Sequence, residues 1–133
     1  MAVVDERSWM RLVEVAKIFL RDRGFDILGS FRVGKSNDSG IVASLPSGEV
    51  VAAAVLDAGK MTSIPLNGLG TSKAAKERAA RFAKVARGEV ARALGWTLPT
   101  DVKPTDFRYD ALWLEGSTAF RSPAISHLVN IKV

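Results

Sequence analysis

Two carboxylates and a lysine are the residues of this sequence whose positions could support phosphodiester chemistry. Two short apolar runs, 41–45 and 50–56, predict an antiparallel hairpin around a turn of four residues. That register places Asp38 opposite Asp57, and Lys60 follows shortly after. Paired carboxylates can hold Mg²⁺, a hard cation that prefers oxygen ligands. The pattern therefore allows a metal site, and the alternative is that both acids are exposed strand-end residues.

Two further motifs are less specific. Residues 29–36 match the phosphate-loop pattern G-x-x-x-x-G-K-[ST]. That chemistry requires a helix that begins at the Lys-Ser pair, whereas the residues after Ser36 predict a turn and then a strand. We therefore interpret the match as a strand and a turn. His127 is the only histidine and cysteine is absent, so no transition-metal site can be completed. We interpret His127 as a hydrogen-bonded residue of the core or its rim.

The excess of positive charge is concentrated in one predicted helix. The chain of 133 residues has 19 Lys plus Arg and 14 Asp plus Glu, a net charge of +5. Residues 71–94 hold seven basic and two acidic residues, and the rest of the chain sums to zero. Such asymmetry indicates a polyanionic partner, although a solvated helix face is the alternative. The predicted nucleic-acid contacts are Lys73, Lys76, Arg78, Arg81, Lys84 and Arg87, helped by Arg32 and Lys35.

The elements that must position these residues follow the order α-β-β-β-α-β-β. Hydrophobic periodicity and turn residues predict helices over 6–23 and from 71 or 72 to 94, and strands over 25–33, 41–45, 50–56, 105–115 and 125–133. The strand at 50–56 is apolar on both faces, which predicts a central, buried position. We expect an α/β fold, a mixed sheet flanked by helices, in a single domain over 1–133.

Composition excludes several protein classes. The sequence is 47% hydrophobic and 25% charged, which is typical of globular proteins and not of disordered chains. No run approaches 18 apolar residues, so we expect no membrane-spanning segment. The first residues lack the apolar stretch of a signal peptide, and the absence of cysteine is compatible with a reducing compartment. We therefore expect a cytoplasmic location.

Several segments, in this order, carry a resemblance to a known family. They are Ala16-x-x-Phe19-Leu20 with Gly24-Phe25, Ile41-Val42-Ala43, Pro65-Leu66 before the basic helix, Phe107-Arg108-Tyr109-Asp110, and Ile125-Ser126-His127-Leu128. Together they cover most of the chain, which resembles the YraN-like family of predicted endonucleases. The resemblance implies a restriction-endonuclease-like fold, similar to that of Holliday-junction resolvases, and DNA as the partner.

The family's catalytic pattern is not kept in this sequence. Gly40 stands where the family has an Asp, and Ala54 and Leu56 stand where it has Glu and Lys. The acid of the family's first helix falls at Val13, with Glu14 one step away. Metal-dependent cleavage needs carboxylates for Mg²⁺ and a lysine for the developing charge. The leading hypothesis is therefore a nucleic-acid-binding pseudoenzyme without a cofactor.

Two other functions stay open. A migrated site at Asp38, Asp57 and Lys60 would make the protein a Mg²⁺-dependent DNA endonuclease or junction resolvase. A structural or assembly subunit is the other possibility. Its basic helix would meet an acidic surface, either on a protein partner or on another copy of the chain.

Overall fold

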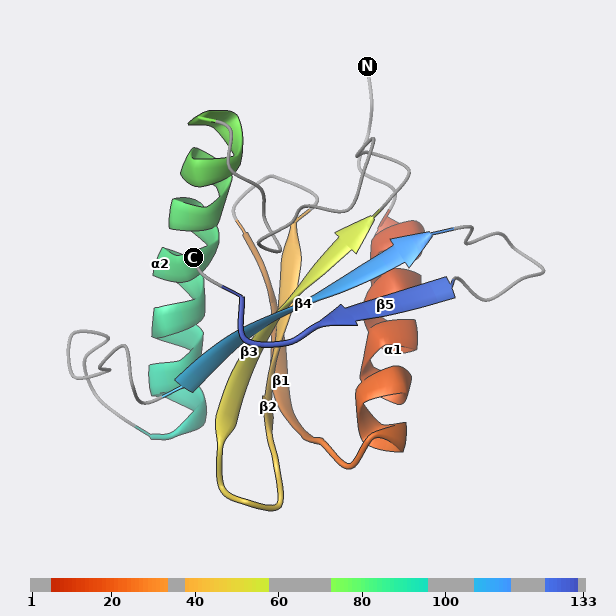
Figure 1. The fold of residues 1–133 in the computed structure, drawn as a ribbon, viewed down its shortest axis with the longest axis vertical. Helices are drawn as coiled ribbons and strands as arrows, with labels where there is room; N and C mark the ends of the chain where they lie inside the picture. The colour runs from red at the N-terminus through yellow and green to blue at the C-terminus, as the bar shows by residue number, and fades with distance from the viewer. Residues whose placement is uncertain (1–5, 34–37, 58–72, 96–106, 116–123, 132–133) are drawn as a thin grey trace.

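Seven elements form an α/β fold in the predicted order. The computed structural model describes residues 6–33, 38–57, 73–95, 107–115 and 124–131. Its elements are α1 (Glu6–Asp22), β1 (Asp26–Arg32), β2 (Ser39–Ser44), β3 (Val50–Asp57), α2 (Lys73–Ala93), β4 (Phe107–Glu115) and β5 (Ala124–Leu128). Figure 1 shows the sheet between the two helices, with α1 and α2 on opposite sides. The predicted fold class and element order are therefore confirmed.

The sheet is mixed, with strand order β1-β2-β3-β4-β5. β3 and β4 are parallel, and the other neighbours are antiparallel. A parallel pair needs a long crossover connection, and α2 lies within this one. The first seven residues of β3 are buried, which confirms the predicted central strand. Within the described ranges, neither helix is long and apolar enough to cross a membrane.

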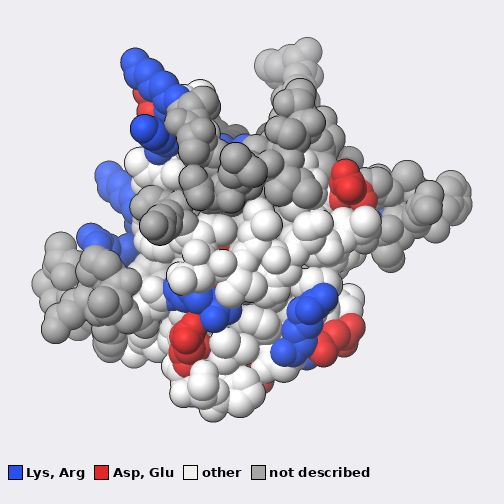
Figure 2. All heavy atoms as spheres, viewed as in Figure 1, with Lys and Arg blue, Asp and Glu red and all other residues white. Residues whose placement is uncertain are grey.

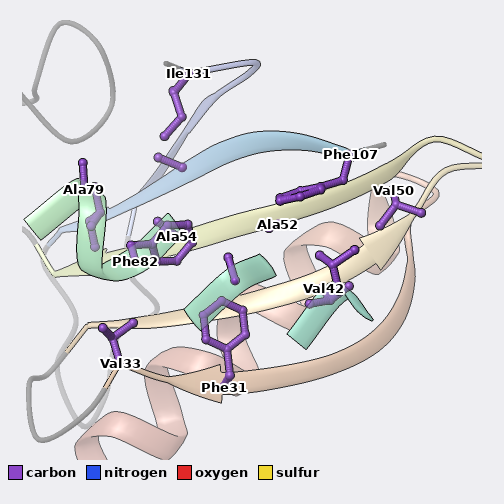
Figure 3. Packing of buried hydrophobic residues seen from close by; sticks show 14 of the residues in the cluster. Phe31, Val33, Val42, Val50, Ala52, Ala54, Ala79, Phe82, Phe107 and Ile131 are labelled. Carbon is purple, nitrogen blue, oxygen red and sulfur yellow. The ribbon is translucent and has the colours of Figure 1, made fainter. Parts of the chain in front are cut away.

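Each helix packs a narrow apolar stripe against one face of the sheet. On α2 the buried residues include Ala79, Phe82, Ala86 and Val90, which recur at the three- and four-residue spacing of one helix side. They join side chains of all five sheet-forming segments in one cluster, part of which Figure 3 shows. α1 contributes Ala16 and Leu20 to a second cluster on the other face. We call these the α2 face and the α1 face of the sheet.

The β2–β3 hairpin pairs one residue away from the predicted register. The Leu45 N–H donates to the Glu49 carbonyl at 2.9 Å, and the Gly48 N–H donates to the Leu45 carbonyl at 2.8 Å. The turn therefore has three residues, and Gly48 takes the left-handed conformation (φ 89°) that closes such turns. Ser44 consequently faces Val50. The predicted opposition of Asp38 and Asp57 is wrong.

The last strand is shorter than predicted. β5 ends at Leu128, although alternating apolar residues predicted a strand up to Val133. Asn130 has a φ of 56°, which turns the chain away from the extended conformation. The Ile131 N–H then donates to the Tyr109 carbonyl at 2.8 Å, so the segment after β5 is held against β4.

Candidate nucleic-acid interface

The basic residues of α2 fall into two groups, because some already have a carboxylate partner. Arg78 binds Asp38, with Nε donating to Oδ2 at 2.8 Å and Nη2 donating to Oδ1. Arg92 donates from Nη2 to Oε1 of Glu89. The other five are exposed and make no ion pair within the described part of the chain: Lys73, Lys76, Arg81, Lys84 and Arg87.

Four of the exposed cations form a line along one side of α2, which we call the basic line: Lys73, Lys76, Lys84 and Arg87. The first and last pairs are each three residues apart, and exposed Ala80 lies four residues from both Lys76 and Lys84. Residues three and four apart are neighbours on a helix surface. At 1.5 Å per residue the basic line is about 21 Å long. In Figure 2, Lys and Arg side chains follow the side of the molecule on which α2 lies in Figure 1.

The surface of α2 keeps most of the net charge of the protein. Glu77 is the one exposed acid on this helix, since Glu89 is engaged with Arg92. Five exposed cations minus one acid leave +4 between residues 73 and 87. No acidic residue occurs from Arg81 to Arg87, so the second half of the surface is purely basic. The structure thus refines the predicted set by removing Arg78, which Asp38 neutralises.

The Arg87 end of the basic line lies close to β4. Tyr109 projects from β4 on the α2 face, where its ring packs at 4.8 Å from the Phe107 ring and 6.2 Å from the Phe82 ring. Burial raises the pKa of the Tyr109 hydroxyl, and the positive charge of Arg87 acts in the opposite direction. The charge of Arg87 at this end of the basic line therefore acts on the hydroxyl of Tyr109.

The two predicted helper residues are not joined to the basic line. Phe31 and Val33 both contribute to the cluster on the α2 face. Strand alternation therefore directs Arg32 to the opposite face of the sheet. Lys35 lies outside the described residues. The predicted interface is thus limited to the exposed residues of α2.

The predicted metal site is not assembled. Leu56 lies on the α2 face, and Asp38 reaches that face as well because it binds Arg78 of α2. Asp57 follows Leu56 by one residue and therefore points to the α1 face. Lys60 lies outside the described residues. Across the described parts of the chain, no group of three or more His, Asp or Glu side chains is placed to hold a metal ion.

The three positions at which the YraN-like family has catalytic residues, Gly40, Ala54 and Leu56, lie close together in the structure. Gly40 pairs with Ala54 across the hairpin, and Leu56 follows on the same face. Ala54 and Leu56 are buried in one cluster with Phe31, shown in part in Figure 3. A Cβ atom on Gly40 would lie 2.7 and 2.8 Å from the two Cε atoms of Phe31, well inside van der Waals contact. The aromatic ring therefore fills the space that a carboxylate at this position would need.

The main polar cluster of the structure was not predicted from the sequence. Asp110 is fully buried in β4, and Arg108 donates to both of its oxygens, from Nε at 2.8 Å and from Nη2 at 2.9 Å. His127 Nε2 lies 2.8 Å from Oδ2, and the Asn130 N–H donates to Oδ1 at 2.8 Å. Arg108 also donates to Glu49 Oε1 at 2.6 Å. We call these five residues the Asp110 cluster.

The Asp110 cluster holds a charged carboxylate inside the protein. Burial acts to raise the pKa of Asp110, but the hydrogen bonds from His127, Arg108 and the Asn130 N–H outweigh it, and the pKa is lowered. The hydrogen bond to Asp110 likewise raises the pKa of Arg108, against the effect of burial. Through His127 and the Asn130 N–H, the charged carboxylate of β4 is bound to β5 and to the segment after it.

The Asp110 cluster lies on the α1 face, away from the basic line. The imidazole of His127 packs with its centroid 6.0 Å from the rings of both Phe19 and Phe25, which confirms a hydrogen-bonded residue at the rim of the core. The sequence did carry a signal, because Arg108 and Asp110 are opposite charges two residues apart in an apolar strand. Such a pair shares one face of the strand and can form a salt bridge there.

Comparisons of the chain with protein-family models, with curated proteins and with solved structures give no match. The resemblance to the YraN-like family therefore stays a prediction from the sequence. Two polar features stand out in the described parts of the chain, the Asp110 cluster and the basic line. The carboxylate of Asp110 is buried and its cluster is internally paired, whereas the four cations of the basic line are exposed and make no ion pair with the described residues. The basic line is therefore the candidate site.

Proposed function

We propose that this protein binds nucleic acid through the basic line of α2 and does not cut it. One observation carries the proposal. Arg78 and Arg92 have carboxylate partners, whereas the five other basic residues of the same helix are exposed without one within the described chain. A fixed row of cations without internal partners suits an external polyanion. DNA is the expected partner because of the family resemblance, and a cytoplasmic location is part of the proposal.

The dimensions of the basic line suit the phosphates of a nucleic-acid backbone. A helix segment about 21 Å long spans about six base pairs, at 3.4 Å per base pair along one strand. Lys and Arg side chains bind phosphates without reading the bases, so the expected binding has no sequence preference. The helix is fixed by its buried stripe of Ala79, Phe82, Ala86 and Val90, which keeps the cations in register.

The proposal of an inactive protein rests on the packing around Gly40. The Phe31 ring leaves no room for a side chain there, and the side chain of the paired residue Ala54 has no polar atom to offer a metal ion. The alternative based on Asp38 and Asp57 depended on a register that the hairpin does not have. Incubation with linear and branched DNA in Mg²⁺ or Mn²⁺ tests this part, and metal-dependent cleavage abolished in Asp57→Ala would contradict it.

Salt-dependent binding to labelled duplex DNA, followed by fluorescence anisotropy, tests the proposal. Phosphate contacts from the four residues of the basic line and from Arg81, five in all, would give a slope of about −4.5 in log K against log salt, or a loss of about 500-fold between 50 and 200 mM. In Lys84→Gln/Arg87→Gln, three remaining contacts would give a slope of about −2.7 and a loss of about 40-fold.

Arg21→Gln is the matched control, because Arg21 is an exposed basic residue of α1 on the other side of the sheet. It should bind like the unmodified protein. Binding that ignores salt, or equal losses in the α1 and α2 variants, would contradict the proposal. If the protein does not bind DNA but does bind an acidic protein ligand, the assembly function is favoured instead.

A further inference from the structure

Gly88 is an unusual residue within α2. It is the sixteenth of the 21 residues of this helix, far from the ends where glycine is common. Glycine in a helix interior is less stable than alanine because it loses more backbone freedom on folding. A glycine at such a position therefore calls for a compensating reason, of which two are usual: a positive φ, or a close neighbour that leaves no room for Cβ.

Neither usual reason applies to Gly88. Its φ is not in the left-handed region, in contrast to Gly24, Gly48 and Gly95. Apart from its two chain neighbours and the backbone of its own helix, a Cβ added to Gly88 would have no described atom within 4 Å. Gly40 is different, because a Cβ at that position would clash with the ring of Phe31. No described neighbour imposes such a steric requirement on Gly88. Alanine would thus fit at position 88 as far as the described residues are concerned.

The surroundings of Gly88 are basic. Lys84 lies one helical turn before it and Arg81 two turns before it, so the three residues share one side of α2. Arg87 precedes it directly at the end of the basic line, and Arg92 follows one turn later. Gly88 itself is half-buried, and the missing side chain leaves part of the helix main chain accessible within the part of α2 that carries no uncompensated acid. A missing side chain at such a place allows a partner to come close to the helix backbone.

We propose that Gly88 is the point of closest approach between α2 and the bound nucleic acid, where the sugar–phosphate backbone lies against the helix main chain and Arg81 and Lys84 hold its phosphates. This inference rests on the proposed function and adds the place and depth of contact. The missing Cβ brings the phosphates within reach of shorter, better ordered contacts from the flanking cations. A side chain at position 88 would hold the polyanion away from the helix.

The inference predicts opposite effects of one substitution on stability and on binding. Gly88→Ala should raise Tm by on the order of 3 °C, because alanine is the better helix former and no described atom opposes it. The same variant should weaken binding to duplex DNA. Gly88→Leu, with a larger side chain, should weaken binding by on the order of tenfold and lower the salt slope as Arg81 and Lys84 lose their phosphates.

Ala124→Leu is the control for added bulk. Ala124 is an exposed residue at the start of β5, which lies beside α1 and away from α2 in Figure 1. Thermal unfolding and anisotropy titrations of the three variants and the unmodified protein complete the test. Binding by Gly88→Leu equal to that of the unmodified protein would overturn the inference, as would a clearly lower Tm in Gly88→Ala. If Gly88→Leu binds normally but Lys84→Gln/Arg87→Gln binds more weakly than the unmodified protein, the inference about Gly88 fails while the proposed function is still supported.

Discussion

Removing the charge of Asp110 should cost this protein a large part of its stability. Asp110→Asn keeps the shape of the side chain but replaces a carboxylate that accepts four hydrogen bonds, two of them from Arg108. The new amide nitrogen is a donor, so it cannot accept from the donors on its side. Hydrogen bonds to charged groups contribute about 1.5–3 kcal/mol, and breaking a buried ion pair costs about 3–5 kcal/mol.

The lower part of that range is expected for Asp110→Asn. The Arg108 side chain is 20% exposed and keeps its bond to Glu49, so its charge is not left wholly without a partner. We expect a loss of about 3 kcal/mol in the free energy of unfolding, against a total of about 5–15 kcal/mol for a typical domain. Urea unfolding followed by far-UV circular dichroism measures it.

Glu49→Gln is the matched control. Glu49 binds the same guanidinium, but its side chain is 46% exposed, and exposed ion pairs contribute about 0–1 kcal/mol. The two variants should therefore differ by about 2 kcal/mol or more. A loss below about 1 kcal/mol in Asp110→Asn, or equal losses in both variants, would refute the assignment of Asp110 as the centre of the cluster.

Acid should reduce the difference between the protein and Asp110→Asn. The folded state lowers the pKa of Asp110, so the carboxylate contributes stability above its unfolded pKa of about 3.9. That contribution is lost as the pH falls from there through the lower folded pKa. Urea midpoints compared at pH 7 and near pH 3 should converge. A constant difference would contradict the pKa direction.

Three further outcomes are expected. Gly40→Ala should lower the free energy of unfolding by about 2 kcal/mol through overpacking against Phe31. The loss should be smaller when Gly40→Ala is introduced together with Phe31→Leu, and an equal loss with and without Phe31→Leu would argue against the steric cause. Arg87→Gln should raise the pKa of Tyr109 further, and tyrosinate absorbance reads it directly because the chain has one tyrosine. Asp38→Asn should lower the urea midpoint by the equivalent of about 1–2 kcal/mol, because Arg78 loses its charged acceptor; an unchanged midpoint would mean that this pair is fully screened.

The parts of the fold that depend on local periodicity could be predicted from the sequence. Helix α2 was predicted from hydrophobic periodicity, and its buried residues Ala79, Phe82, Ala86 and Val90 keep that spacing because a helix repeats every 3.6 residues whatever it packs against. The hairpin register was wrong by one residue, because a four-residue turn was assumed where Gly48 closes a three-residue one. Because side chains alternate between the two faces of a strand, a shift of one residue changes which side chains share a face. Asp38 and Asp57 are therefore not opposite each other.

The candidate site was predicted only in part for a different reason. The sequence shows which residues are basic, but the neutralisation of Arg78 depends on Asp38, which is 40 residues away. The Asp110 cluster joins residues 49, 108, 110, 127 and 130, and no local pattern connects such distant positions. Long-range pairing of charges depends on the topology of the sheet, so it becomes visible only once β3, β4 and β5 are placed.

The Asp110 cluster also has a consequence for the order of events while the chain is being synthesised. Asp110 and Arg108 leave the ribosome before His127 and Asn130, which supply two of the four hydrogen bonds to the carboxylate. Until then the outer edge of β4 has no strand beside it, because β5 is its partner on that side. A nascent chain halted before residue 127 would expose an apolar strand edge and an incompletely bound carboxylate, which favours aggregation or proteolysis. The final residues of the sheet thus complete the protection of the chain against both.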